Sequence, residues 1–227
     1  MEFVNTLIKN LPTFGEALLK TLELAAVAIL LALILGIIFG LFTVSGFKIL
    51  EILSAIYIDI IRGTPLLVQT FIIYYGLAQS LKPLGFSWSN IGGPFTAGVV
   101  ALSLNAGAYM AEIIRGGIQS VDKGQMEAAR SLGLPYFKAM RRVILPQAFL
   151  TMLPSMINQF IITLKDTSLI SIIGIRELTQ NGKIIAANAA SMVMSVWLVV
   201  ALFCLHNSCK ICQDSGKEDC IWQKIKS

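Results

Sequence analysis

The feature that most constrains this chain is a set of long apolar runs, each close to the length of a membrane-spanning helix. No charged residue stands between Leu24 and Thr43, for example. An α-helix of about 20 apolar residues crosses a hydrocarbon core about 30 Å thick. Runs of this kind predict five spans, at residues 18–44, 50–78, 95–114, 146–164 and 184–205.

The composition agrees with an integral membrane protein. Hydrophobic residues make up 56% of the 227-residue chain and charged residues only 14%, whereas a soluble domain has about 25% charged residues. The apolar runs lack the two-residue alternation of barrel strands, and helices satisfy their own backbone hydrogen bonds in lipid. The predicted fold class is therefore an all-α membrane protein with five transmembrane helices. The first residues lack the pattern of a cleavable signal peptide.

The distribution of basic residues predicts the orientation. The connection between the third and fourth spans is rich in Lys and Arg, whereas the preceding connection contains only Lys82. By the positive-inside rule the basic connection is cytoplasmic, which places the N-terminus outside the cell membrane and the C-terminus in the cytoplasm. These loops explain the net charge of +5, so we expect contact with membrane lipid and no nucleic-acid binding. The basic residues of the connection are Arg115, Lys123, Arg130, Lys138, Arg141 and Arg142.

The residues before the first span have two interpretations. A helix there would carry several apolar residues on one face, which is typical of a short amphipathic helix in the outer interface of the membrane. The same residues also fit a simple extension of the first span. The apolar residues concerned are Phe3, Val4, Leu7, Ile8 and Leu11.

The basic connection, residues 115–145, predicts a helical hairpin. Asp122 is a suitable N-cap, and Gln125 stands where a capping box has its second residue. Gly133 fits the position that ends a short helix, and Pro135 suits the start of the next one. Such a hairpin suits docking to a soluble partner, or resting on anionic lipid as an amphipathic helix. In the second helix, Phe137, Met140 and Ile144 share one face, and Lys138, Arg141 and Arg142 share the other.

The same connection carries a motif. The sequence EAARSLG, then nine residues, then VILP resembles the signature loop of permease subunits of ATP-binding-cassette importers. That pattern has Glu-Ala-Ala, three residues, Gly, nine residues, Ile, one residue and Leu-Pro, and Val143 replaces the Ile here. RGTPLLVQ (62–69), AYMAEIIRGGIQSVDKGQ (108–125) and KDTSL (165–169) resemble the histidine and glutamine branch, which imports polar amino acids. The resemblance covers residues 21–200.

The resemblance implies partners and a mechanism. It implies two permease copies or a pair of close relatives, a cytoplasmic ATP-binding subunit and an extracytoplasmic substrate-binding protein. ATP and Mg would bind to the ATPase, so this chain is expected to bind no cofactor and to be no enzyme; it also lacks a Gly-rich phosphate loop. In this family the short helix docks into the ATPase and transmits its motion, which drives alternating access. The implied coupling residues are Gln125, Glu127, Ala128, Ala129, Gly133, Leu145 and Pro146.

Polar residues within the predicted spans indicate a path for a polar solute. Ionisable groups in a membrane are costly and are therefore functional candidates. Asp59 and Arg62 can form an (i, i+3) ion pair, and Gly63 and Pro65 predict a helix interruption. On the third and fourth spans, polar residues recur at helical spacing. The candidate substrate-path residues are Arg62, Thr64, Asn105, Tyr109, Glu112, Asn158, Gln159, Thr163 and Asp166.

The candidate substrate-path residues also have interpretations other than contact with a substrate. The interruption after Arg62 also fits a packing kink, Glu112 can pair with Arg115, and the amides can bond between helices. In a substrate path, Asp59, Glu112 and Asp166 would suit a cationic amino acid. The rival functions are an ion-gradient-driven secondary transporter, in which the signature loop would have no role, and a non-transporting scaffold or sensor subunit, against which the polar stripes count.

The C-terminal tail differs from the rest of the chain. We assign residues 1–207 to the permease domain and 208–227 to an atypical cytoplasmic tail, where thiols would stay reduced. A zinc site is one hypothesis, but the ligand spacing is not that of a common zinc module, so we expect no metal. A frameshifted C-terminus is the other. The residues concerned are Cys204, His206, Cys209, Cys212 and Cys220.

Overall fold

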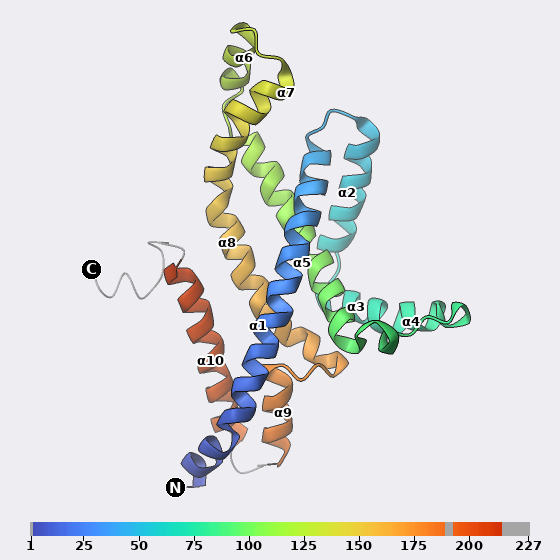
Figure 1. Cartoon of the computed structure of the whole chain (residues 1–227), viewed down its shortest axis with the longest axis vertical. Coiled ribbons are helices and arrows are strands. Elements are labelled where there is room, and N and C mark those ends of the chain that lie inside the picture. The colour runs from blue at the N-terminus through green and yellow to red at the C-terminus, as the bar shows by residue number, and fades with distance from the viewer. Residues whose placement is uncertain (1, 189–192, 215–227) are drawn as a thin grey trace. The chain divides into compact units, whose positions relative to one another are not determined.

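The computed structural model describes residues 2–188 and 193–214, and this part of the chain is helical, without a β-strand (Figure 1). The chain divides into two compact units. The terminal unit comprises Met1–Leu30, Pro65–Ser103 and Ile161–Ser227, and the central unit comprises Leu31–Thr64 and Leu104–Phe160. Three long helices contribute to both units: α1 (Glu2–Thr43), α5 (Gly93–Gln119) and α8 (Leu145–Ile170).

In the central unit, glycines allow α1 and α5 to pack closely. Gly36 and Gly40 stand one turn apart on α1, and a Cβ atom at Gly40 would lie 2.9 Å from Cγ2 of Ile114. This small-residue spacing lets membrane helices approach each other. The other elements of the unit are α2 (Lys48–Arg62), α6 (Lys123–Ser131), α7 (Tyr136–Ala139) and the π-helical turn η4 (Met140–Ile144).

Tyr57 holds α2 against the rest of the central unit. Its ring stacks on Phe39 of α1 with the centroids 4.2 Å apart, and its hydroxyl donates a hydrogen bond to the carbonyl of Leu104 on α5 at 2.7 Å. These contacts place the end of α2 beside α5. The apolar core of the unit consists of Met110, Ile114, Ile118, Ile144, Ala148, Met152 and Met156.

The terminal unit contains the chain that follows the break after α2. Its elements are α3 (Leu66–Phe71), the π-helical turn η1 (Ile72–Gly76), α4 (Leu77–Ser80), the 3-10 turns η2 (Lys82–Leu84), η3 (Trp88–Ile91) and η5 (Ser171–Ile173), α9 (Leu178–Asn188) and α10 (Val193–Asp214). The indole of Trp88 donates to the carbonyl of Tyr74 at 3.0 Å, which fixes the loop after α4 on η1. Its core consists of Phe14, Ala17, Leu178, Ile185, Ala186, Val196 and Val200.

Within the described residues, three helical segments are long and apolar enough to cross a membrane: Asn10–Thr43, Gly93–Gln119 and Tyr136–Ile173. They overlap the first, third and fourth predicted spans. The second predicted span is not one continuous helix, because α2 ends at Arg62 and α3 begins at Leu66. The predicted interruption is thus confirmed, and Pro65, which has no N–H to donate to the ladder, stands at the N-cap of α3. Counting the broken pair as one span gives four.

The two ends of the chain differ from the predicted pattern. The fifth predicted span, 184–205, overlaps the end of α9, which is described to Asn188, and the start of α10, which is described from Val193; residues 189–192 lie outside the description. The apolar stretch of α10, Val193–Cys209, is shorter than the other spans. At the other end, α1 is continuous from Glu2 onward, so the N-terminal residues extend the first helix and form no separate one. The side chains before Asn10 lie outside the description.

Candidate functional site

The hairpin between α5 and α8 begins at a capped helix. The Asp122 carboxylate accepts a hydrogen bond from the N–H of Gly124 at 2.9 Å, which confirms the predicted N-cap of α6. The predicted capping box is wrong for Gln125, because among the described residues its side chain makes no hydrogen bond back to Asp122. Gln125 and Glu127 instead point into solvent.

Gly133 ends α6 as predicted. It has φ +81°, and its N–H bonds the carbonyl of Arg130 at 2.9 Å while the N–H of Leu134 reaches Ala129 at 3.2 Å. This pair of bonds is the Schellman pattern, which requires a left-handed residue at this position. Pro135 then forms the N-cap of α7. The hairpin is therefore an ordered element and not a loose linker.

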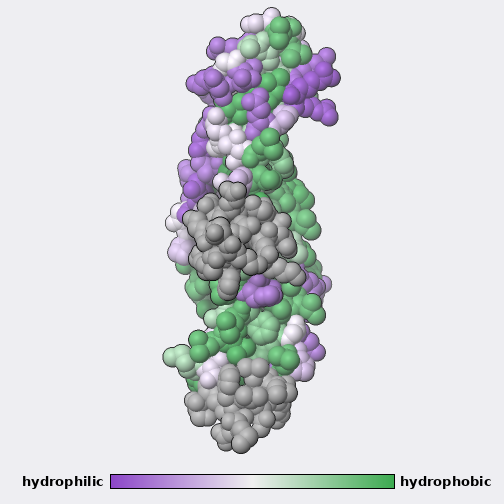
Figure 2. Space-filling view, turned by 90° about the vertical axis from the view of Figure 1, so that its left-hand side faces the viewer, coloured by the Kyte–Doolittle hydropathy of each residue, from purple (hydrophilic) through white to green (hydrophobic). Residues whose placement is uncertain are grey.

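The outer surface of the hairpin is mixed apolar and basic. Leu132 is 84% exposed and Phe137 is 74% exposed, whereas Met140 and Ile144 of the same predicted helix are half-buried and buried. Ala129 and Ala139 face inward. Figure 2 shows hydrophilic surface gathered over the end that carries α6 and α7, with apolar patches among it. Exposed apolar side chains ringed by charge are typical of a protein-docking surface.

A π-helical turn joins the hairpin to α8, and sequence reasoning missed it. The N–H of Leu145 bonds the carbonyl of Met140, five residues back. Pro146 has no N–H for the carbonyl of Arg142, so the α-helical ladder is interrupted here. Single π-turns of this kind occur frequently at functional sites. The proline of the motif is the signal that could have predicted it.

A charged cluster lies where the end of α2 meets α5. Arg115 donates from Nε to Oε2 of Glu112 at 3.0 Å and from Nη2 to Oε1, and its Nη1 donates to Gln119 at 2.7 Å. Arg62 approaches the same carboxylate, with Nη1 3.8 Å from Oε1, and its guanidinium lies 5.3 Å from the ring centroid of Tyr109. The predicted pairing of Glu112 with Arg115 is confirmed.

The predicted partner of Arg62 was wrong. In the described part of the chain, Arg62 pairs with Glu112 on α5 and not with Asp59 one turn earlier on α2. Local spacing permits the (i, i+3) pair, but the packing of α2 on α5 brings a second carboxylate within reach. Asp59 is exposed.

The other candidate path residues are distributed over both units. Asn105 and Gln159 are buried in the central unit, where Asn158 is exposed. Thr64 is exposed and donates to the carbonyl of Ile60 at 2.8 Å. Thr163 is buried and Asp166 half-buried, both in the terminal unit. The structure thus brings Arg62, Tyr109 and Glu112 together, and the remaining residues stay predictions.

A buried acid that sequence reasoning missed caps α9. The side chain of Glu177 is almost fully buried, and its two oxygens accept bonds from the N–H groups of Thr179 at 2.8 Å and Gln180 at 2.7 Å. Burial raises the pKa of this carboxyl, and these bonds together with the charge of Lys183 offset part of the rise. An acid at the start of a helical pattern is the signal that could have indicated it.

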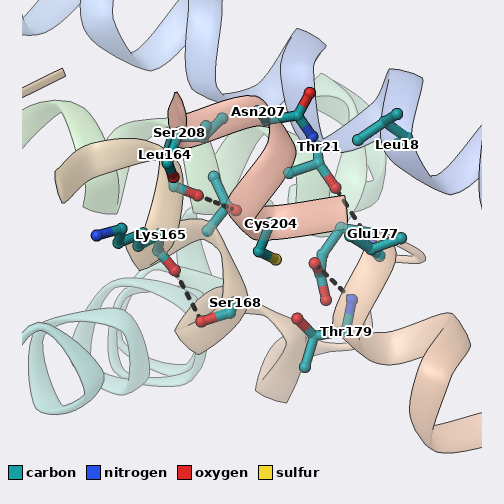
Figure 3. Close-up of a pocket in the computed structure, with 12 residues that line it drawn as sticks. Leu18, Thr21, Leu164, Lys165, Ser168, Glu177, Thr179, Cys204, Asn207 and Ser208 are labelled. Carbon is teal, nitrogen blue, oxygen red and sulfur yellow. Dashed lines mark hydrogen bonds between the residues drawn. The ribbon is translucent and has the colours of Figure 1, made fainter. Parts of the chain in front are cut away.

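Glu177 lines a small cavity with Cys204 and Ser208 of α10 (Figure 3). The cavity volume of about 20 Å³ suits one or two water molecules and is far too small for an amino acid. Among the described residues, no three His, Cys, Asp or Glu side chains gather as a metal site. The side chains of Cys212 and Cys220 lie outside the described residues. The zinc hypothesis needs these side chains and therefore stays a prediction.

Comparison with known proteins decides the family. A model of the family described as binding-protein-dependent transport system inner membrane component matches residues 24–209. The chain belongs to this family. It is 42% identical over 173 residues, 76% of each chain, to the arginine transport system permease protein ArtQ of Bacillus subtilis (strain 168). It is 40% identical over 196 residues, 86% of each chain, to the glutamine transport system permease protein GlnP of Escherichia coli (strain K12).

Solved structures agree with this assignment. An amino acid ABC transporter crystallised with histidines has a chain with TM-score 0.85 and 36% identity, covering 99% of each chain. The inward-facing MetNI methionine ABC transporter has TM-score 0.62 at 17% identity, covering 91% of this chain and 96% of its own, which shows the fold alone. The predicted all-α permease fold is confirmed, although the count of five spans is not.

Membership of this permease family shows the general role of the chain. It is the membrane-embedded permease subunit of an amino-acid ABC importer. It is no enzyme itself, because the ATPase of such importers is a separate subunit. The family also implies an ATP-binding subunit and a substrate-binding protein as partners.

Proposed function

We propose that this permease imports polar amino acids by alternating access and is driven through the hairpin between α5 and α8. The observation that carries the proposal is the ordered hairpin, in which the motif residues form a capped helix with Glu127 exposed. A rigid helix transmits force, whereas a loose loop would absorb it. The π-turn before Pro146 joins this helix to α8.

The assembly we propose follows from this arrangement. Two permease copies, or one copy and a close relative, would surround the path, with the hairpin of each on a cytoplasmic ATPase that binds ATP and Mg. An extracytoplasmic binding protein would deliver the amino acid. The N-terminus would lie outside and the C-terminus in the cytoplasm, since the basic hairpin favours the cytoplasmic side.

The docking surface has the composition such a contact requires. Leu132 and Phe137 supply exposed apolar area, and Arg130, Lys138 and Glu127 surround it with charge. Apolar contacts at the centre and charges at the rim give protein interfaces both affinity and register. A hairpin that only rested on lipid would need its apolar residues on one continuous face. Here they cluster at the turn instead.

The names of the relatives and the acidic residues of the chain narrow the amino acids that it would prefer as substrates. Relatives are named for arginine and glutamine transport, which share a polar side chain and an α-carboxylate. Glu112 is already engaged by two arginines, so it does not offer a free site for a cationic side chain. A preference for basic amino acids would therefore depend on Asp59, the exposed acid of α2, and on Asp166, the half-buried acid of α8.

The test uses the chain reconstituted with its ATPase subunit in proteoliposomes. We expect ATP hydrolysis to be stimulated by loaded binding protein and polar amino acids to accumulate inside. Glu127→Lys, which reverses an exposed charge on α6, should abolish stimulation and ATPase co-purification, while the matched Glu16→Lys on α1 should not. If no ATPase associates with the wild type, or if Glu127→Lys transports normally, the coupling role is wrong.

A further inference from the structure

We propose that Arg62 binds the carboxylate of the transported amino acid, and that Arg115 and Gln119 are positioning residues that keep Arg62 available for it. This inference rests on the proposed function as an amino-acid permease. It identifies which group of the substrate the chain recognises, and it assigns roles to two residues that belong neither to the signature loop, which begins at Glu127, nor to the candidate substrate-path residues.

The first observation is that Glu112 is already neutralised by its own helix. Arg115 holds both carboxylate oxygens through two parallel N–H donors, which is the strongest geometry for this pair. Gln119 accepts a bond from Arg115 at 2.7 Å and fixes the guanidinium from the next turn. Residues 112, 115 and 119 follow one face of α5. The hydrogen bonds among residues 112, 115 and 119 therefore form within α5 and do not need α2.

The second observation is that Arg62 is only loosely held. Its distance of 3.8 Å to Glu112 exceeds the roughly 2.7–2.9 Å of a charge-assisted hydrogen bond. The ring of Tyr109 lies 5.3 Å away and stabilises the cation without using its in-plane N–H donors. Arg62 thus keeps a fork of donors that fits a planar carboxylate.

The third observation is the charge of the cluster. The paired groups are two guanidiniums and one carboxylate, which leaves one positive charge in excess among them, while Asp59, the other nearby acid on α2, makes no ion pair among the described residues. The excess positive charge of the paired groups attracts a carboxylate. The Arg62 side chain is 39% exposed, and an arginine facing lipid is costly. This face therefore suits a water-filled path.

The role of Arg115 follows from these observations. Without Arg115, Arg62 would be the nearest cation for Glu112, and the two would close into a neutral pair. The carboxylate of a substrate would then have to compete with Glu112 for Arg62. Removing Glu112 as well would leave Arg62 free again.

The experiment measures direct binding to the permease–ATPase complex in nanodiscs, without the binding protein. Radiolabelled arginine and glutamine are the probes. Two competitors are compared for each probe: the unlabelled amino acid, and its α-carboxamide, which lacks the negative charge of the α-carboxylate. We expect the carboxamides to compete at least about tenfold less well. Arg62→Gln should weaken binding by a similar factor, whereas Arg62→Lys should retain part of it.

The positioning role is tested by a pair of variants. Arg115→Gln should weaken binding about tenfold, and the double variant Glu112→Gln with Arg115→Gln should restore it, which a merely structural role for Arg115 would not do. Lys48→Gln, an exposed cation on the same helix as Arg62, is the matched control and should bind as the wild type does.

Each outcome separates this inference from the proposed function. Binding of amino acid and carboxamide with equal affinity, or unchanged binding by Arg62→Gln, would overturn the carboxylate site while leaving the permease function intact. Failure of the double variant to recover would overturn the role of Arg115. A wild-type complex that associates with the ATPase but binds and imports no amino acid would instead contradict the proposed function.

Discussion

The hydroxyl of Thr21 accepts a hydrogen bond from the backbone N–H of Leu178 at 3.1 Å, although 157 positions separate the two residues. Leu178 begins α9, so its N–H has no partner within the helix. Thr21 in turn donates to the carbonyl of Ala17 at 2.9 Å. Together with Glu177, which accepts from the next two N–H groups, Thr21 ties the start of α9 to α1.

Thr21→Val should therefore destabilise the terminal unit. Valine has nearly the same shape but leaves the N–H of Leu178 without an acceptor, at about 1–3 kcal/mol. Thermal unfolding of the purified permease in detergent should show a lower midpoint for Thr21→Val and a near-normal one for Thr21→Ser, which keeps the oxygen. Thr13→Val, at an exposed site on the same helix, is the control. Equal midpoints for the two valine variants would contradict the role of the bond.

Glu177 should make stability depend on pH. Because burial raises the pKa of its carboxyl, the folded protein holds the proton at pH values where the unfolded chain has released it. This contribution is complete below the ordinary glutamate pKa of about 4.3 and is lost as pH rises through the raised value. Glu177→Gln cannot ionise, so its unfolding midpoint should fall less over that range.

The measurement is the unfolding midpoint from pH 4 to 8 for wild type, Glu177→Gln and Glu16→Gln. Glu16 is exposed, so its variant should follow the wild-type curve. Parallel curves for all three proteins would mean that Glu177 is not the group that titrates.

Gly133→Ala should impair the hairpin without a steric clash. No atom lies within 4 Å of a Cβ built at Gly133, but its φ of +81° costs an L-residue about 1–2 kcal/mol. We expect the end of α6 to shift and ATPase stimulation to fall severalfold in the reconstituted complex. Gly116→Ala also meets open space, within a helix, and should be neutral or slightly stabilising. Full stimulation by Gly133→Ala would show that the turn is not needed for coupling.

Much of the local structure could be predicted because it depends on neighbours in the chain. Asp122 and Gly133 bound α6 as their side-chain chemistry requires, and Pro65 breaks the helix wherever the rest of the chain goes. The pairing of Glu112 with Arg115 follows from spacing on one helix. A prediction failed where packing decided, as for Arg62, whose partner Glu112 comes from another helix.

The sequence by itself determined the membrane class, the helical hairpin with its motif, and the family. These depend on apolar run length, capping and residue spacing, which act over a few turns of helix. Only the tertiary structure decided that Arg62 meets Glu112 and that Thr21 and Glu177 share the capping of α9. The physical reason is that such contacts depend on how closely helices approach, and residues such as Gly36 and Gly40 set that distance through contacts with residues remote in the chain.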